Sequence, residues 1–424
     1  MSKVGINRRS FIQSAAVVAA APAVLGSSSS KKDEVPAGPP LKVGLVGCGG
    51  RGTGAVGNAI ESAPNIEVTV LADVFDNQVQ KTRASLTKYG QEIPSSRCFV
   101  GFDAYRKVLE TDVDYVILAT PPHFRPEHFS ALVAAGKHAF IEKPAGVDPV
   151  GIRTMFEAAG RSEKKGLCVV AGTQRRHALE YLETRKRIAG GAIGEIVSAR
   201  GYWNQGAVWH RVPRPQWDEM TNMLWDWNNW SWLSGDHIVE QHIHQIDVIH
   251  WFLGGNPVTA NGFGGRHRRA TGDQFDFFSV EYAHDDGVLF HSQARQINGC
   301  SNNVSELLVG TRGSTNCADL IYGPSGDVIW EYEGERPNPY VQEHTDLVRA
   351  IRTGEQINEA RQVAESTLTA IMGRVSAYTG EVVRREEFLN SSLRLGPSEY
   401  QWGGVSVSEK MAIPGQPAGP PKGI

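Results

Sequence analysis

Three glycines near residue 50 have the spacing of a loop that holds phosphate groups. Gly47, Gly49 and Gly52 form a GxGxxG motif that directly follows an apolar run at residues 41–46. The first glycine permits a tight turn, the second lets the backbone approach a diphosphate, and the third allows a helix to pack on the preceding strand. The helix N-terminus then offers free amides to the phosphates. The motif predicts a dinucleotide site with the loop residues Gly47, Gly49, Gly50, Arg51 and Gly52.

An acidic residue follows where the adenosine ribose of a dinucleotide is bound. Asp73 lies 26 residues after Gly47, at the end of a second apolar run at residues 66–72. A carboxylate at this place accepts hydrogen bonds from the ribose hydroxyls and repels a 2′-phosphate. NAD is therefore the expected cofactor. Arg51 and Arg83 are basic residues that leave NADP open as an alternative.

The elements that must position these residues alternate between strands and helices. Short apolar runs predict buried parallel strands, and helical patterns such as residues 129–135 fill the intervals. This alternation predicts an α/β Rossmann domain, with a doubly wound parallel sheet, over residues 41–171. The predicted strands are residues 41–46, 66–72, 114–120, 138–142 and 167–171.

The pattern changes after residue 172. Four predicted strands, without regular helices between them, indicate an α+β domain over residues 172–402 with a large, mostly antiparallel, open-faced sheet. Residues 342–378 return to a helical pattern and are expected to pack back toward the Rossmann domain. Residues 403–424 are rich in Gly, Pro and Ser, which predicts a flexible tail. The four strands are residues 196–202, 275–282, 288–293 and 304–309.

The N-terminus resembles a bacterial twin-arginine export signal. Arg8 and Arg9 precede an alanine-rich apolar run at residues 14–25, which is too short to span a bilayer comfortably. We expect a signal peptide over residues 1–26, a linker over residues 27–40, the twin-arginine translocation machinery as a partner, and a periplasmic location without a stable membrane span. This route carries folded proteins, so the cofactor is expected to be loaded before export and held tightly.

Composition excludes several other classes of function. The 424 residues carry a formal net charge of −3 and contain no long Lys/Arg tract, so nucleic acid is not an expected partner. The five cysteines are scattered and lack a CxxC pair, which argues against a disulfide framework and a zinc–thiolate site.

Two further segments, together with the glycine loop, resemble the Gfo/Idh/MocA family of oxidoreductases. The first segment contains Thr120-Pro121-Pro122-His123 and ends in Glu142-Lys143-Pro144, and the second covers residues 235–254. The resemblance extends over residues 42–383. It implies NAD(P)-dependent hydride transfer with a sugar, a polyol or a sugar derivative. Among the motif residues, it implies cofactor contacts for Thr120, Pro121, His123, Glu142 and Lys143.

The resemblance also implies catalytic roles. Lys143 would lie beside the nicotinamide and hydrogen-bond the reacting hydroxyl. His244, in an H-x-x-D motif with Asp247, would take the substrate proton. A histidine suits this role because its ordinary pKa lies near neutral pH. A lysine beside an oxidised nicotinamide should have a lowered pKa and can share the proton relay.

The sequence departs from the family pattern at three positions. Glu240 replaces the usual aspartate, His242 the usual glycine, and Pro122 the usual asparagine. Glu240 keeps a carboxylate with a longer reach and is still expected in the catalytic group. The crowding of His237, Glu240, His242 and His244 invites a metal-binding interpretation. On one helix only Glu240 and His244 share a face, so proton transfer and substrate contacts are favoured over a metal.

Two more regions are candidate substrate contacts. Gln174 and Arg176 follow the last predicted Rossmann strand, where ligands gather, although a solvated hinge between domains explains them equally well. Asp247 is the third candidate. Seven of the ten tryptophans fall between Trp203 and Trp232. They are interpreted either as the core of a loop insertion or as a wall that stacks on sugar rings.

Three functions remain open. The first is a sugar or polyol oxidoreductase. The second is an NAD-dependent glycoside hydrolase, which oxidises a sugar ring transiently, eliminates the glycosidic bond and shows no net redox change. The third is a protein that binds a dinucleotide and a sugar without turnover. A homo-oligomer is also expected, because one face of the second sheet lacks a cover.

Overall fold

The computed structural model describes residues 35, 37–407 and 411–415. The predicted export signal and most of the predicted linker lie outside these residues. All described residues belong to one structural unit. None of the described helices is long and apolar enough to cross a membrane.

The first sheet contains six parallel strands in the order β3-β2-β1-β4-β5-β6. All five strands predicted in this half are present. Only β3 was not predicted, because its apolar run is three residues long between Arg97 and Gly101, whereas the equally short β6 lies within a five-residue apolar run at residues 167–171. The strand order reverses between β1 and β4, which is where doubly wound sheets bind ligands. The strands are β1 Leu41–Val46, β2 Ile66–Asp73, β3 Cys98–Val100, β4 Tyr115–Leu118, β5 His138–Ile141 and β6 Val169–Ala171.

Helices cover both faces of this sheet, which explains why its strands are apolar on both sides. Along β4, Tyr115 and Ile117 belong to a core shared with α1, whereas Val116 and Leu118 belong to a core shared with α4 and α5. Side chains of a strand alternate between faces, so each face gains every second residue. The helices of this domain are α1 Gly50–Ser62, α2 Asp76–Leu86, α3 Ala104–Leu109, α4 Arg125–Ala134 and α5 Pro149–Lys164.

The second sheet has nine strands in the order β14-β13-β12-β11-β7-β10-β9-β8-β15. Its neighbours pair antiparallel except for β7 and β10, which are parallel. The predicted combination of a Rossmann domain and a mostly antiparallel α+β domain is therefore confirmed. The strands are β7 Ile196–Gln205, β8 Thr259–Gly265, β9 Phe277–Ala283, β10 Leu289–Gln296, β11 Asn303–Gly310, β12 Gly313–Thr315, β13 Leu320–Tyr322, β14 Val328–Glu331 and β15 Val383–Arg384.

The four predicted strands of this sheet correspond to β7, β9, β10 and β11. The analysis missed β8, whose seven residues include three glycines and only one large apolar side chain, Phe263. Glycine has a low preference for strands, so only pairing with β9 reveals this segment as one. β12 to β15 are two to four residues long and carry no periodic pattern of their own.

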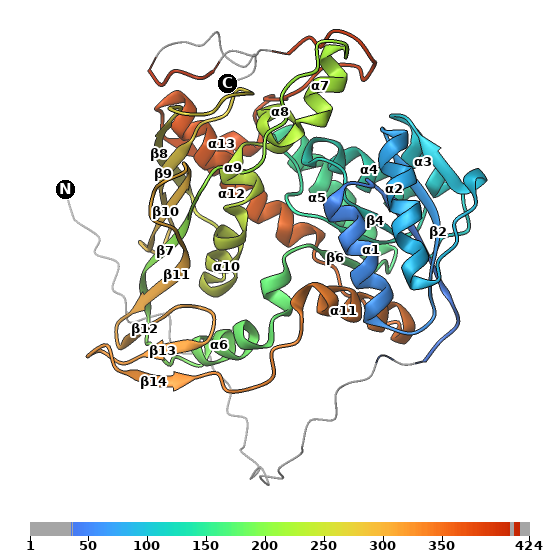
Figure 1. The fold of residues 1–424 in the computed structure, drawn as a ribbon. Coiled ribbons are helices and arrows are strands. Elements are labelled where there is room, and N and C mark those ends of the chain that lie inside the picture. The colour runs from blue at the N-terminus through green and yellow to red at the C-terminus, as the bar shows by residue number, and fades with distance from the viewer. Residues whose placement is uncertain (1–34, 36, 408–410, 416–424) are drawn as a thin grey trace, which may run out of the picture. The chain divides into compact units, whose positions relative to one another are not determined.

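The helical stretch predicted at residues 342–378 is two helices rather than one. α11 (Pro339–Thr353) ends at Gly354, which has a φ of +75°, and α12 (Ala360–Thr379) follows. Between them the Glu359 amide donates to the Val169 carbonyl of β6 at 2.9 Å. α11 contacts α1, and α12 contacts α5 and β8 (Figure 1).

The remaining helices are short and mostly surround the second domain. They are α6 Leu179–Ala189, α7 Glu219–Trp225, α8 Ser231–Ser234, α9 His237–Glu240, α10 Ile243–Leu253 and α13 Arg385–Leu389. Single 3₁₀ turns complete the elements: η1 Thr87–Tyr89, η2 Ser95–Arg97, η3 Pro122–Phe124, η4 Gln174–His177 and η5 Trp227–Asn229.

The structure differs from the predicted flexible tail in the described residues 403–407. The Gly403 amide donates to the Asp218 carboxylate at 3.0 Å, and the Gly403 carbonyl accepts from the Met220 amide at 3.0 Å. The Val405 amide donates to Glu219 Oε2 at 2.6 Å. Composition suggested flexibility, but these bonds attach this part of the chain to the start of α7.

Candidate active site

A cavity of about 760 Å³ lies at the carboxyl ends of the Rossmann strands. Its lining includes the glycine loop and, from the second domain, residues between 209 and 244. Asp73 ends β2 and Lys143 follows β5, and the strands β1 and β4 separate them. Strands lie about 4.8 Å apart, so these residues mark two distinct ends. We call them the Asp73 end and the Lys143 end.

The glycine loop has the shape that a diphosphate requires. Gly47 has a φ of +100°, and a Cβ on Gly52 would lie 1.8 Å from the Gly47 carbonyl oxygen. In front of Gly49 and Gly50 there is open space within the cavity. α1 begins here without a side-chain cap, so its first amides are available to an anion. These residues fit a dinucleotide.

The Asp73 end combines one carboxylate with aromatic rings. The Asp73 carboxylate accepts from the Cys48 amide at 2.6 Å and from the Phe75 amide at 2.9 Å, which fixes its orientation. Burial raises the pKa of Asp73 above its ordinary value. Phe75 and Phe102 line the cavity beside it. This end therefore offers a fixed acceptor next to an apolar surface.

At the Lys143 end, the lysine is held by Glu240. Lys143 Nζ donates to the Glu240 carbonyl oxygen at 2.5 Å and to its Oε1 at 3.0 Å. The side chains of Lys143 and Glu240 are only 14% and 13% exposed. Burial raises the pKa of Glu240, although Lys143 opposes this shift. Glu240 Oε2 is buried without a hydrogen-bond partner in the described structure. One ammonium proton of Lys143 is thus left for a ligand.

His244 lines the same end of the cavity. It is the second residue of α10, and its ring stacks on Trp203 with centroids 5.7 Å apart and an angle of 25° between the rings. Burial, followed by the positive charge of Lys143, holds the pKa of His244 well below its ordinary value. The imidazole is therefore neutral near pH 7 and is able to accept a proton.

Glu142 also lines the Lys143 end, in an ion pair with Arg51 of the glycine loop. Burial lowers the pKa of Arg51, but the charge of Glu142, its hydrogen bond and the charge of Glu343 together outweigh burial, and the net shift is upward. The Arg51 guanidinium lies 5.0 Å from the centre of the Tyr340 ring. Gln174 Nε2 donates to the Tyr340 hydroxyl at 3.2 Å. Gln174 is thus at the cavity, as expected.

Arg125 is a site residue that the sequence analysis missed. Its guanidinium is buried and donates to the Thr120 carbonyl at 2.5 Å and to the Pro144 carbonyl. It thereby joins the two loops that carry Thr120, Pro121 and Lys143, all of which line the cavity. No local signal marks this residue, because both partners are backbone atoms brought close only by the fold.

Three residues that were expected to contact a ligand do not line the cavity. His123 does not belong to the cavity lining; its Nε2 lies 2.8 Å from the Tyr400 hydroxyl. Arg176 and Asp247 are also absent from the lining. They bind each other, with Arg176 Nε 2.8 Å from Asp247 Oδ2, and Ser366 donates to Asp247 at 2.8 Å. Arg176 and Asp247 hold η4 against α10 in this structure and do not face a ligand.

The histidines that lie close in the sequence near Glu240 have different neighbours in the fold. His242 Nε2 lies 2.6 Å from the Ser292 hydroxyl, and burial lowers the pKa of His242 to about 3. The His237 ring lies edge-on to Phe278 at 5.0 Å. Within the described ranges, no group of three or more His, Cys, Asp or Glu side chains is arranged to hold a metal ion.

The rings of the tryptophan cluster divide between the cavity lining and an apolar core. Trp209, Trp225 and Trp227 line the cavity, and Trp203 supports His244. Trp230 and Trp232 instead pack into an apolar cluster with α7. The sequence indicated the cluster, but only the fold shows which rings face the cavity.

The fold and the cavity define a two-domain dinucleotide-binding protein of the oxidoreductase class. Residues 41–172 match the model of the "Oxidoreductase family, NAD-binding Rossmann fold", and residues 181–316 match the "GFO/IDH/MocA C-terminal domain". The two matches together cover more than half of the chain. The chain belongs to the Gfo/Idh/MocA family, and NAD is the cofactor that its Rossmann domain binds.

Individual relatives are distant. Inositol 2-dehydrogenase of Salmonella paratyphi B is 25% identical over 213 residues, which cover 50% of this chain and 54% of that protein. The chain therefore spans about half the length of this relative. A glycosyl hydrolase family 109 protein of Shewanella amazonensis is 25% identical over 356 residues, which cover 79% of this chain and 71% of that protein.

Solved structures share the fold. The apo scyllo-inositol dehydrogenase of Lactobacillus casei superimposes with a TM-score of 0.62 at 20% identity, and the match covers 82% of this chain and 99% of that one. At this identity the likeness concerns the fold alone.

Proposed function

We propose that this protein is an NAD-dependent oxidoreductase that transfers a hydride to or from a sugar, a polyol or a sugar derivative. The single observation that carries the proposal is the Lys143 end, where Lys143, Glu240 and a neutral His244 line one cavity with the glycine loop. When bound, the nicotinamide supplies the hydride acceptor or donor.

The residues of this end divide the remaining work. In the direction of oxidation, His244 accepts the proton of the substrate hydroxyl, because it is neutral and partly open to the cavity. Lys143 donates a hydrogen bond to the reacting oxygen from the ammonium proton that Glu240 leaves unused. Glu240 orients the Lys143 ammonium through its carbonyl oxygen and Oε1. Adjacent donors and acceptors of this kind suit a polyhydroxylated substrate.

The two cavity ends then take the two halves of the cofactor. Asp73 accepts from the adenosine ribose at its end, and the α1 amides bind the diphosphate. Thr120, Pro121 and Glu142 line the cavity toward the Lys143 end and are assigned to the nicotinamide half. This assignment favours NAD over NADP because the Asp73 carboxylate repels a 2′-phosphate.

A second candidate function is NAD-dependent glycoside hydrolysis. The Shewanella amazonensis protein supports it, because that alignment covers more of both chains than the inositol dehydrogenase alignment does. The same His244 and Lys143 would serve a transient ring oxidation. In this case the aglycone would leave by elimination after the transient oxidation, and no net NADH would accumulate.

One assay separates the two functions. The purified protein is incubated with a panel of inositols, aldoses and aryl glycosides, without added cofactor and then with NAD. A lasting increase in NADH absorbance with a polyol or aldose supports the oxidoreductase. Release of the aryl group without net NADH indicates the hydrolase. Absence of both, in a protein that contains NAD, would favour a binding protein and contradict the proposal.

We also propose export by the twin-arginine route, on the basis of Arg8, Arg9 and the apolar run that follows them. Replacement of both arginines by lysine should retain the protein in the cytoplasm of a bacterium that expresses it. Cell fractionation measures this. Equal periplasmic amounts of both forms would contradict the proposal.

A further inference from the structure

A wall of aromatic side chains runs along the cavity on the side opposite the Rossmann loops. It belongs to residues 206–232, which we call the tryptophan segment. The Trp209 and Trp227 rings lie 6.0 Å apart, and Trp225 contacts Phe75 edge-on at 5.6 Å. Trp209, Trp225 and Trp227 all line the cavity. Three rings of the segment therefore face the cavity, together with the polar side chains of Arg211 and Asn228.

The tryptophan segment spans both ends of the cavity. At the Lys143 end, Gln241 Nε2 donates to Asn228 Oδ1 at 3.0 Å, directly after Glu240. At the Asp73 end, Trp225 rests on Phe75, two residues after Asp73. A dinucleotide that reaches from one end to the other must lie under this segment.

Arg211 adds a positive charge to the wall. Its guanidinium lies 4.7 Å from the centre of the Trp209 ring and 4.1 Å from the centre of the Trp225 ring, and it lines the cavity. Of the other cations that line the cavity, Arg51 and Lys143 are each paired with a carboxylate, Arg125 binds two backbone carbonyls, and Lys81 belongs to α2. In the described part of the chain, no carboxylate oxygen lies within 4 Å of the Arg211 guanidinium nitrogens. Arg211 Nη1 donates to the Trp225 carbonyl at 2.6 Å, and the backbone amide of Arg211 donates to Asp226 at 2.7 Å. The guanidinium thus has no direct carboxylate partner, and its positive charge can complement an anion in the cavity.

The C-terminal part of the chain fastens the segment to the Rossmann domain. We call residues 399–407 the strap. Trp402 packs on Phe102 at 5.0 Å and on Phe75 at 6.1 Å between ring centres, and Tyr400 stacks on Phe102 at 6.0 Å. Phe75 and Phe102 are the two rings that line the Asp73 end. Further along, Gly403 and Val405 of the strap bond to the start of α7, as described above.

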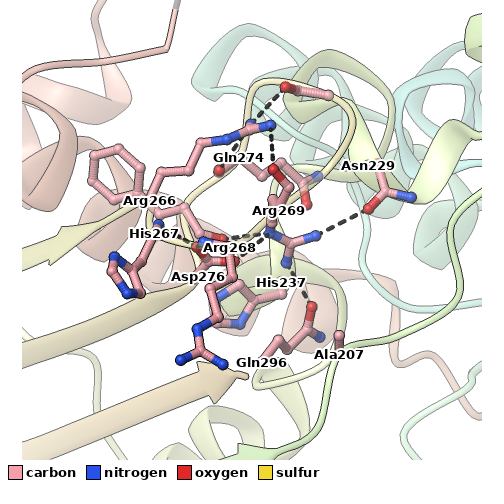
Figure 2. Close-up of polar contacts among 12 residues, drawn as sticks. Ala207, Asn229, His237, Arg266, His267, Arg268, Arg269, Gln274, Asp276 and Gln296 are labelled. Carbon is pink, nitrogen blue, oxygen red and sulfur yellow. Dashed lines mark hydrogen bonds and ion pairs between the residues drawn. The ribbon is translucent and has the colours of Figure 1, made fainter. Parts of the chain in front are cut away.

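On its other side the segment is fixed to the second domain. Asp226 accepts from the Thr271 hydroxyl at 3.0 Å, and the Ser231 amide donates to Asp273 at 2.7 Å. Arg269 donates to Asn229 Oδ1 at 3.0 Å and to Gln296 Oε1 at 2.6 Å (Figure 2). These bonds attach it to the loop between β8 and β9, so the wall is held from both domains.

We propose that the tryptophan segment and the strap form a retaining wall for the adenosine diphosphate half of NAD, with Arg211 as its anion-binding residue. The inference rests on the proposed function, and it adds that the cofactor stays on the protein between reaction cycles. The Rossmann side supplies the amides of α1 and the Asp73 carboxylate. The opposite side supplies aromatic area and a cation, and release requires the strap or the segment to move.

The first test measures how fast NADH leaves the protein. Energy transfer from the tryptophans to bound NADH reports dissociation after mixing with excess NAD. We expect the unmodified protein to keep its NADH through dialysis. Trp402→Ala and Arg211→Gln should each raise the dissociation rate about tenfold, because an aromatic contact or a charge pairing is lost. Trp330→Ala is the matched control, since Trp330 stacks on Arg187 outside the cavity lining.

The second test needs no substitution in the wall. Trypsin cleaves after Lys and Arg, so we expect cleavage after Arg211 in the tryptophan segment and after Arg312 in the exposed turn between β11 and β12. Saturating NADH should slow cleavage after Arg211 several-fold and leave cleavage after Arg312 unchanged. If circular dichroism shows that a variant fails to fold, trypsin protection of the unmodified protein still tests whether the wall covers the cofactor.

The outcomes separate this inference from the proposed function. Tight NADH binding with rapid release, or equal release rates in all variants, overturns the retaining wall and leaves the proposed function in place. Equal protection of both trypsin sites also overturns it. A protein that binds neither NADH nor NADPH overturns both proposals.

Discussion

The two ends of one cavity are built from different kinds of side chain. The Lys143 end contains ion pairs, Lys143 with Glu240 and Arg51 with Glu142, beside the neutral ring of His244. The Asp73 end contains one oriented carboxylate among the rings of Phe75, Phe102 and Trp225. Polar groups in a partly dry site are suited to move protons and orient a reacting atom. Aromatic area is suited to hold a ligand without reacting with it.

This difference predicts which substitutions should alter turnover and which should alter cofactor binding. A change at the Lys143 end should reduce turnover and leave cofactor affinity nearly intact. A change at the Asp73 end should alter cofactor affinity or choice and leave the chemical step nearly intact. Each prediction below tests this division, in order of decreasing effect.

The largest effect is expected from Lys143→Ala. It removes the donor to the reacting oxygen and leaves the buried Glu240 carboxylate without its partner. Turnover should fall by at least about 10³-fold, while the amount of NAD released on denaturation stays unchanged. Single-turnover absorbance and cofactor content measure the two quantities. Retention of full activity would remove Lys143 from the mechanism, and parallel loss of cofactor would break the division between the ends.

His244→Gln should have the next largest effect, because it removes the proton acceptor and keeps a polar side chain of similar size. We expect a loss of about 10²- to 10⁴-fold in the oxidation rate, with NADH affinity unchanged. In the unmodified protein the acid limb of the rate profile should lie below pH 6.5, since the pKa of His244 is lowered. An unchanged rate and an unchanged acid limb in the variant would exclude His244 as the base.

Local patterns in the sequence predicted the Rossmann half and much of the Lys143 end. The glycine spacing and the apolar runs depend on neighbouring residues, so the loop at Gly47 and the strands β1 to β6 were visible except for β3. Lys143 and His244 came from short motifs that resemble a known family. Both side chains line the cavity, and their catalytic roles remain predictions.

Contacts between distant segments were not visible in this way. Tyr340 lines the cavity from α11, and Arg125 binds two backbone carbonyls in separate loops. The directions of His123 and Asp247 depend on partners far along the chain, Tyr400 and Ser366. A motif fixes which residue is present, but packing against remote elements decides which way its side chain points.

Asp73→Asn tests the other end of the cavity. The amide keeps one acceptor for the Cys48 or Phe75 amide but removes the negative charge. The preference for NADH over NADPH should fall by about tenfold to a hundredfold, because the repulsion of the 2′-phosphate is lost. Fluorescence titration gives the two dissociation constants. The lost hydrogen bond affects both cofactors equally. The ratio of the two dissociation constants therefore reports only the effect of the Asp73 charge, and an unchanged ratio would contradict the role of Asp73. The turnover number with saturating NAD should stay within about twofold.

The smallest effect concerns how the two ends respond to acid. Behind the Lys143 end, His344 is fully buried and stacks on Phe140 at 4.2 Å, and burial followed by the charge of Arg51 lowers the pKa of His344 to about 3. Below pH 6.5 His344 binds a proton in the unfolded chain but stays neutral in the folded state. The free energy of unfolding therefore falls as the pH falls. Burial raises the pKa of Asp73, so this carboxylate takes up its proton more readily in the folded state. Its contribution to stability therefore rises as the pH falls, opposite to that of His344.

His344→Phe should therefore flatten the acid dependence of stability. Phenylalanine keeps the stacked ring and removes the titrating group, so the variant should lose about 1 kcal/mol less than the unmodified protein between pH 6.5 and 5.5. Urea unfolding at pH 5.5, 6.5, 7.5 and 8.5 measures this difference. The curves of the two proteins should run parallel above pH 7.5, which serves as the internal control. Parallel curves across the whole range would show that His344 is protonated in the folded state, and the Lys143 end would then tolerate an additional positive charge beside Arg51.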